Sequence, residues 1–171
     1  NDALISLAGP ANKQGRIIAD NICGGDSRYL GSQGSSVIKV FDMTAATTGI
    51  NETNAKKSGL EVDTVILSPM SHAGYYPGGK VMTMKVVFEK ETYRLLGAQI
   101  IGYEGVDKRI DVLATAIHAG LKATQLKDLD LAYAPPYSSA KDHVNMAGFM
   151  IDNIAKGTLK QWHLEDMDKI S

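Results

Sequence analysis

The sequence has little of several features that mark particular classes of protein. Its single cysteine, Cys23, excludes an internal disulfide framework and favours a reducing compartment, so we expect a cytoplasmic protein. No apolar run approaches the length of a membrane span, and the N-terminus lacks the basic and apolar segments of a signal peptide. The net charge of −1 gives no reason to expect nucleic acid or a membrane surface as a partner.

Nucleotide and metal motifs are also missing. No G-x-G-x-x-G occurs, so the chain by itself cannot bind FAD or NAD in the usual Rossmann manner. Residues 74–80 match the first part of a P-loop, but Val81 replaces the required Ser or Thr and a strand pattern follows where a helix is needed. No metal site is predicted, because the histidines are not spaced like ligands from one another or from the cysteine. They are His72, His118, His143 and His163.

The hydrophobic pattern predicts a sheet in the middle of the chain. Residues 61–68, 80–88 and 95–101 read as strands, and the polar turn between the last two predicts an antiparallel hairpin. Residues 61–102 are therefore expected to form a three-stranded antiparallel sheet. Residues 36–41 read as a further strand that is covered on both faces, because apolar side chains occur at alternate and intervening positions.

Helical spacing predicts the elements that pack on this sheet. Residues 106–119 and 140–156 are expected to be amphipathic helices, and Asn51 is expected to cap a short helix that Gly59 ends. A short strand at residues 4–7 should lead through Gly-Pro into a helix that ends before Gly24, with Cys23 packed near its end. The predicted fold class is α+β, with a three-stranded or larger antiparallel sheet and helices packed on it.

Residues 131–145 form the most distinctive stretch of the chain. Pro135 and Pro136 fix their own φ angles and donate no backbone N–H, so they should hold Tyr133 and Tyr137 in a stiff loop. Ser139-x-x-Asp142 then predicts a capping box that opens the last helix. The motif alone favours a turn between two helices with the tyrosines packed in the core.

This stretch resembles the Tyr-Ala-Pro-Pro-Tyr-Ser-x-x-Lys-Asp segment of flavin-dependent coenzyme A-disulfide reductases, which are pyridine nucleotide-disulfide oxidoreductases. Residues 7–16 are similar to the last part of the FAD-binding domain in that family. The resemblance covers nearly the whole chain but only the C-terminal end of the full enzyme. It implies the end of an FAD-binding domain at 1–34, a dimerisation domain at 35–157, and a linker toward a possible rhodanese domain at 158–171. Because the chain starts at Asn1 without an initiator methionine, we expect a fragment.

The resemblance also implies site residues. In the family the segment reaches across the dimer to the partner subunit's flavin and reactive cysteine, so Tyr75 and Tyr133 are expected to be catalytic, with Tyr133 also near FAD. Most disulfide reductases use a His before a Pro as the acid-base group, and this chain has no His-Pro. A pair of phenols can instead donate hydrogen bonds to a coenzyme A or cysteine thiolate.

The remaining expectations concern the bound groups and partners. The resemblance implies FAD contacts and coenzyme A contacts in the full-length homodimer, with NADH or NADPH as electron donor. The FAD residues are Ala8, Gly9 and Pro10, and the coenzyme A residues are Asn12 and Lys141. The chain alone is expected to bind none of these groups tightly and to be inactive. His143 stands where the family usually has proline.

Two alternatives to a coenzyme A-disulfide reductase remain open. The same architecture serves NADH oxidases and persulfide reductases, and the motifs do not separate these substrates. The chain could also be a dimerisation or binding module without a catalytic role.

Overall fold

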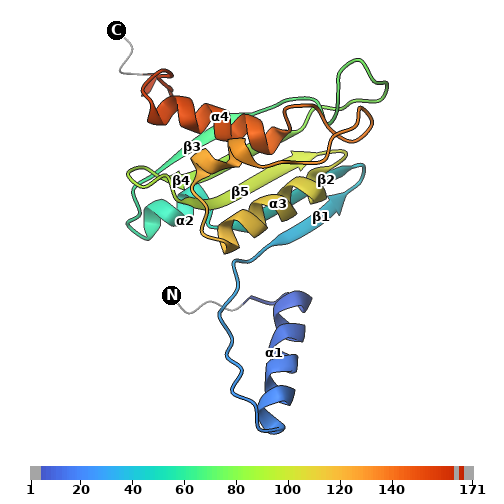
Figure 1. Ribbon diagram of the computed structural model, residues 1–171, viewed down its shortest axis with the longest axis vertical. Coiled ribbons are helices and arrows are strands. Elements are labelled where there is room, and N and C mark those ends of the chain that lie inside the picture. Colours follow the sequence, from blue (N-terminus) through green and yellow to red (C-terminus); the bar gives the residue numbers. More distant parts are fainter. Residues whose placement is uncertain (1–4, 164–165, 168–171) are drawn as a thin grey trace.

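The fold is an α+β arrangement built on one five-stranded sheet, as a computed structural model of residues 5–163 and 166–167 shows (Figure 1). The strand order is β1-β2-β5-β4-β3, and every neighbouring pair is antiparallel. The strands are β1 Ser36–Val40, β2 Met43–Gly49, β3 Val62–Leu67, β4 Thr83–Glu89 and β5 Leu95–Gly102.

The predicted three-stranded unit is confirmed as one side of this sheet. β4 and β5 form the expected antiparallel hairpin, and β3 pairs with β4 on its other side. β2 was missed by the sequence reading, because its run of Ala and Thr residues carries no strong hydrophobic alternation. β2 nevertheless joins the sheet by pairing with both β1 and β5.

The prediction that residues 36–41 are covered on both faces was wrong. β1 is the outer strand of the sheet, and Val37 and Ile38 are 57% and 61% exposed. Phe41 lies outside the strand with a φ of 52°, in the tight connection to β2, and is 94% exposed. A run of apolar residues shows that a strand can be buried, but it does not show whether a neighbouring element packs on that strand.

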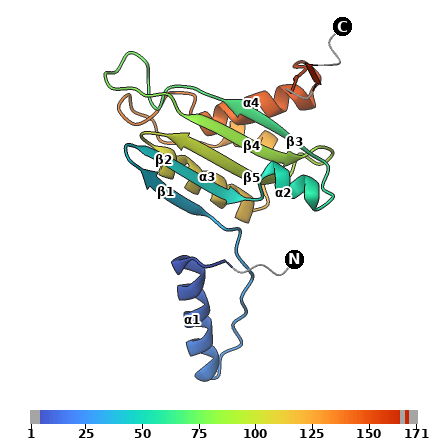
Figure 2. The same ribbon diagram turned by 180° about the vertical axis from the view of Figure 1, so that it is seen from behind.

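The main core lies between one face of the sheet and three helical elements (Figures 1 and 2). These elements are α3 Val106–His118, the 3-10 helix η1 Ala123–Asp128 and α4 His143–Ala155. Leu113 of α3 and Ile151 of α4 are fully buried against sheet residues such as Val86. Both long helices follow the predicted spacing, but α4 begins at His143 and not near residue 140.

Among the described residues, the opposite face of the sheet carries only the short helix α2, Glu52–Lys57, at one end (Figure 2). Asn51 caps α2 as predicted, by accepting a hydrogen bond from the backbone N–H of Asn54 at 2.8 Å. Ala55 of α2 packs with Val87 and Leu96 in a small second core. The rest of this face is open and holds a shallow hollow of about 390 Å³.

The first helix, α1 Ala8–Ile22, stands apart from the sheet at the end of an extended connection (Figures 1 and 2). None of its residues is buried, and Cys23 at its C-terminus is exposed, so the expected packing of Cys23 was wrong for this chain. Residues 5–7 form no strand, and the rest of the predicted strand at 4–7 lies outside the described residues. No described helix is long and apolar enough to cross a membrane.

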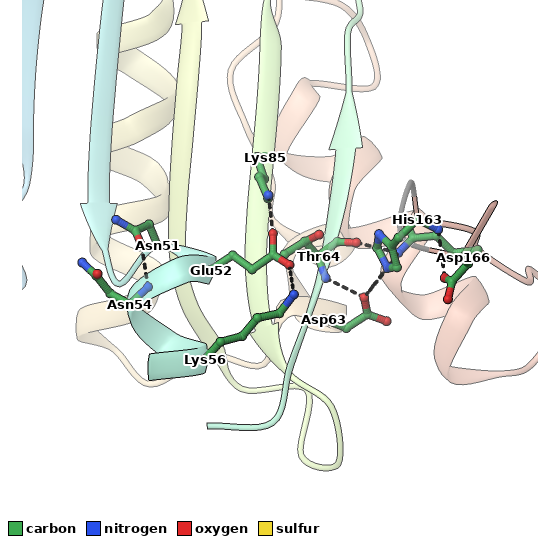
Figure 3. Close-up of polar contacts among 10 residues, drawn as sticks. Asn51, Glu52, Asn54, Lys56, Asp63, Thr64, Lys85, His163 and Asp166 are labelled. Carbon is green, nitrogen blue, oxygen red and sulfur yellow. Dashed lines mark hydrogen bonds and ion pairs between the residues drawn. The ribbon is translucent and has the colours of Figure 1, made fainter. Parts of the chain in front are cut away.

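The body around the sheet begins near residue 33. The Gln33 side chain donates to the carbonyl of Ala114 at 2.8 Å, and its own carbonyl accepts the N–H of Gly49. At the other end of the chain, His163 lies 2.8 Å from Asp63 on β3, as Figure 3 shows. The same view shows Glu52 between Lys85 and Lys56. Residues 164–165 and 168–171 of the predicted linker lie outside the described residues.

Candidate active site

Two loops that are far apart in the sequence lie side by side at one end of the sheet (Figures 1 and 2). One loop joins β3 to β4, and the other joins η1 to α4. An isolated bridge between Met70 and Val81 closes the base of the first loop. The N–H of Ala73 donates to the carbonyl of Ser138 at 2.9 Å and connects the first loop directly to the second.

The hydroxyl groups of Tyr75 and Tyr133 meet across these loops. Their oxygens are 2.7 Å apart, although the residues are 58 positions apart in the sequence. Tyr75 is 76% exposed and Tyr133 is 44% exposed, so the pair faces solvent and is not packed in the core. In this chain neither Tyr75 nor Tyr133 is buried in the core.

The hydroxyl of Tyr133 is protonated at neutral pH. The hydrogen bond from Tyr75 raises the pKa of Tyr133 above its ordinary value, and desolvation of the phenol adds to this rise. When one hydroxyl donates to the other, the second O–H remains free to donate outward. The pair can thus donate a hydrogen bond to an anion that approaches from solvent.

The Pro-Pro segment forms a turn in the second loop. The N–H groups of Tyr137 and Ser138 both donate to the carbonyl of Ala134, at 2.9 and 3.2 Å. Tyr137 is 71% exposed, and its hydroxyl makes no hydrogen bond to any described residue. Tyr137 shares the loop with Tyr133 but does not take part in the tyrosine pair.

The predicted capping box at Ser139 was wrong. Asp142 is itself the N-cap of α4, and its Oδ1 accepts the N–H of Val144 at 3.0 Å. Asp142 is held in this role because its Oδ2 pairs with Arg109 and accepts from the hydroxyl of Ser138. Residues 139–141 therefore remain in the loop.

Arg109 was not singled out from the sequence, although it lies at the centre of this region. It is 1% exposed and occupies the core-facing stripe of α3 together with Val106 and Leu113. The sequence did contain a signal for this role, because Arg109 is a charged residue inside the apolar stripe of the helix. Buried arginines are rare unless they are paired, so such a position indicates a partner for the charge.

Two histidines lie close to the loops. His143, the first residue of α4, is fully buried, and its burial, followed by the charge of Arg109, lowers its pKa to about 4. His143 is therefore neutral at physiological pH. His72 is buried against the ring of Tyr76 at 5.5 Å, with Nδ1 3.1 Å from the carbonyl of Ala73. No described hydrogen bond joins His72 to Tyr75.

Most of the residues expected at FAD and coenzyme A lie on α1 and not in the two loops. Ala8, Gly9 and Pro10 form the first turn of α1, where no side chain caps the helix. The side chain of Asn12 donates to the carbonyl of Ala8 at 2.9 Å, and Lys141 is exposed in the second loop. Within one chain α1 lies well away from the tyrosine loops, so the structure does not bring the α1 residues to the tyrosine pair (Figure 1). No group of His, Cys, Asp and Glu among the described residues is able to hold a metal ion.

Residues 35–144 match the model of the pyridine nucleotide-disulphide oxidoreductase dimerisation domain. The chain belongs to this family. It is 38% identical over 148 residues to the coenzyme A disulfide reductase of Staphylococcus epidermidis, and 36% identical over 148 residues to that of Staphylococcus aureus. Each match covers 86% of this chain and 33% of the relative, so the chain spans about a third of the length of these enzymes.

Solved structures give the same result. The reduced CoADR-RHD of Bacillus anthracis superimposes with a TM-score of 0.94 and 48% identity, over 99% of this chain and 31% of that one. An NAD-dependent persulfide reductase from A. fulgidus superimposes with a TM-score of 0.92 and 41% identity, over 99% of this chain and 31% of that one. A water-forming NADH oxidase from Lactobacillus brevis superimposes with a TM-score of 0.86 and 25% identity, over 93% of this chain and 36% of that one. The expected family and the α+β dimerisation-domain fold are thus confirmed.

Proposed function

We propose that this chain is the dimerisation part of a longer flavoenzyme that reduces coenzyme A disulfide with NADH or NADPH. In this proposal Tyr75 and Tyr133 reach the active site of the partner subunit in a homodimer. The proposed domain limits are 1–34 for the end of the FAD-binding domain, 35–157 for the dimerisation domain and 158–171 for a linker. The exposed α1 and the first contact with the sheet body at Gln33 support the first boundary.

The observation that carries the proposal is the 2.7 Å contact between the hydroxyls of Tyr75 and Tyr133. Reduction of a disulfide releases a thiolate, and a hydrogen bond aimed at the developing charge lowers the barrier. Two phenol hydroxyls in contact at an exposed loop end have the chemistry for this task. They replace the acid-base histidine that the chain lacks, since it has no His-Pro.

The residues of α1 fit a flavin contact. Ala8 and Gly9 bring backbone N–H groups to the uncapped start of a fifteen-residue helix, a position suited to the polar edge of a bound group. A methyl group on Gly9 meets nothing within 4 Å in this chain, so the approach is open. FAD, when bound, would carry electrons from the nicotinamide to the disulfide. Asn12 and Lys141 are proposed to contact coenzyme A, with Lys141 facing its phosphates.

A persulfide is the second candidate substrate. The similarity to the A. fulgidus persulfide reductase, with a TM-score of 0.92, favours it nearly as strongly as the similarity to CoADR-RHD favours coenzyme A disulfide. Both substrates release a sulfur anion, so the same tyrosine pair serves either. Comparison of the two substrates with the full-length enzyme decides between them.

The test replaces the hydroxyls one at a time in the full-length enzyme. Tyr75→Phe and Tyr133→Phe should each slow reduction of the disulfide by roughly ten- to a thousand-fold, as loss of one oxyanion donor does. The fold-decrease in the rate of disulfide reduction in the double variant should be smaller than the product of the two single fold-decreases, because both hydroxyls serve one leaving group. Rapid-mixing kinetics measure this step apart from flavin reduction by NADH or NADPH, which should not change.

Tyr137→Phe is the matched control, because Tyr137 lies in the same loop and its hydroxyl contacts no described residue. It should keep the parent rate. Parent rates in both Tyr75→Phe and Tyr133→Phe would show that the pair has no catalytic role and would favour a dimerisation module without catalytic duty.

A further inference from the structure

We propose that Arg109 is a positioning residue that clamps the two loops together and thereby sets the contact between Tyr75 and Tyr133. The importance of that contact for the reaction rests on the proposed function, whereas the clamp itself rests on geometry alone. We call Arg109, Ser138 and Asp142 the arginine clamp.

The guanidinium of Arg109 donates to both loops. Its Nη2 lies 3.1 Å from the carbonyl of Ser71, four residues before Tyr75. The same nitrogen lies 3.2 Å from the hydroxyl of Ser138 and 3.4 Å from the carbonyl of Tyr137, in the loop that carries Tyr133. Nη2 has two N–H groups, which these acceptors share with Asp142, so this one nitrogen lies between the two loops within hydrogen-bond distance of each.

Asp142 fixes the guanidinium in turn. Its Oδ2 lies 2.9 Å from Nη2 and 3.1 Å from Nε of Arg109, and both side chains are nearly fully buried. Burial raises the pKa of Asp142, but the Ser138 hydroxyl and the charge of Arg109 outweigh this and hold the pKa below its ordinary value. The Asp142 carboxylate is therefore ionised at neutral pH. Because Asp142 also caps α4, the clamp is anchored to two helices of the core.

Gly105 gives the guanidinium its place. Nη1 of Arg109 donates to the carbonyl of Gly105 at 3.1 Å, and a Cβ on Gly105 would lie only 2.1 Å from that nitrogen. Gly105 also has a φ of 68°, which disfavours any other residue. The absence of a side chain at Gly105 thus leaves the space that the guanidinium of Arg109 occupies.

A purely stabilising role does not account for this arrangement. Replacing a buried ion pair by apolar residues of similar volume is often neutral or stabilising. The contacts that an apolar side chain cannot supply are the directional ones to Ser71 and Ser138, which belong to separate loops. Arg109 therefore contributes the relative position of the loops, and with it the meeting of the two tyrosine hydroxyls.

The first test follows the tyrosine pair without any catalysis. In the 171-residue chain with ¹³C-labelled tyrosine, NMR titration reports Tyr75 and Tyr133 separately. Arg109→Lys keeps a positive charge for Asp142 but loses the fork, and it should move the titration of Tyr133 to lower pH, toward its ordinary value. Ser138→Ala is the gentler variant, because it removes the hydroxyl contacts with Arg109 and Asp142 but leaves the ion pair, and it should shift the titration of Tyr133 in the same direction.

Leu113→Ala is the control for general destabilisation. Leu113 is fully buried on the same helix, and it takes no part in the clamp. It should lower thermal stability at least as much as Ser138→Ala while leaving the Tyr133 titration unchanged. An unchanged titration in Arg109→Lys, or in Ser138→Ala if Arg109→Lys does not fold, overturns the clamp, and an equal shift in Leu113→Ala also overturns it.

The second test is kinetic and uses the full-length enzyme. Arg109→Lys or Ser138→Ala should slow disulfide reduction on the order of ten- to a hundred-fold, as small misplacements of reacting groups do. Flavin reduction by NADH or NADPH should keep the parent rate. If the Tyr133 titration shifts and disulfide reduction does not slow, the clamp stands and the proposed role of the tyrosines fails.

Discussion

The Oδ1 atom of Asp142 accepts a hydrogen bond from the backbone N–H of Val144 at 3.0 Å, and this contact sets the start of α4. The other oxygen of the same carboxylate pairs with Arg109. One side chain therefore joins helix capping to a buried ion pair, and the two roles are separable by substitution.

Asp142→Asn should lower the free energy of unfolding by about 3–5 kcal/mol, because it leaves Arg109 buried without a counter-ion while Asn remains a good cap. Asp142→Ala should cost about 1 kcal/mol more, because the cap is also lost. Urea denaturation of the chain measures both values. Combining Asp142→Asn with Arg109→Met should be less destabilising than the sum of the single changes, and strict additivity would show that the two side chains are not coupled.

His143 should make stability depend on pH. Its pKa of about 4 in the folded chain lies below the ordinary value of 6.5, so the unfolded chain binds more protons between these values. His143 therefore contributes about 3 kcal/mol to the free energy of unfolding. This contribution is fully present above pH 6.5 and is lost as the pH falls toward 4. Urea denaturation at several pH values within this window measures the slope.

His143→Pro is the matched variant for this slope. Proline is favoured at the first helical position, and Asp142 before it has φ −62° and ψ 157°, which a following proline accepts. The variant should fold with α4 intact and lose the slope between pH 4 and 6.5 that His143 contributes. A slope equal to that of the parent chain would mean that other groups cause it.

Gly148 should not tolerate a side chain. A Cβ there would lie 2.2 Å from the backbone nitrogen of Lys127, because α4 and η1 approach closely at this point. Gly148→Ala should therefore destabilise the domain by roughly 1–3 kcal/mol or more, as overpacking does. Gly15→Ala in α1 is the control, since its Cβ meets nothing within 4 Å, and it should favour that helix by up to about 1 kcal/mol. Circular dichroism and urea denaturation compare the two, and equal effects would contradict the packing argument.

The 171-residue chain should self-associate. It carries a dimerisation domain, and its open sheet face exposes apolar side chains such as Ile38 and Ile66, which are 61% and 55% exposed. A two-fold pair is the most common closed arrangement. Sedimentation at micromolar concentration should reveal a dimer. A clean monomer would indicate that other parts of a longer protein supply much of the interface.

The sequence by itself determined the local elements and the family. The alternation in β3 to β5 and the spacing in α3 and α4 are properties of neighbouring residues, so they could be read without coordinates. The Tyr-Ala-Pro-Pro-Tyr stretch carried the resemblance that the match over residues 35–144 confirms. The same resemblance, and not any spacing, pointed to Tyr75 and Tyr133 as a pair.

Tertiary structure decided which residues are covered and which ones meet. Val37 and Ile38 are exposed because β1 lies at the edge of the sheet. An apolar run does not specify which other elements pack against it. The 2.7 Å contact of the tyrosines depends on two loops brought together by the order of the strands and by α4. Arg109 reaches both loops only because α3 is folded beneath them, so its position was set by contacts between distant residues that no local pattern contains.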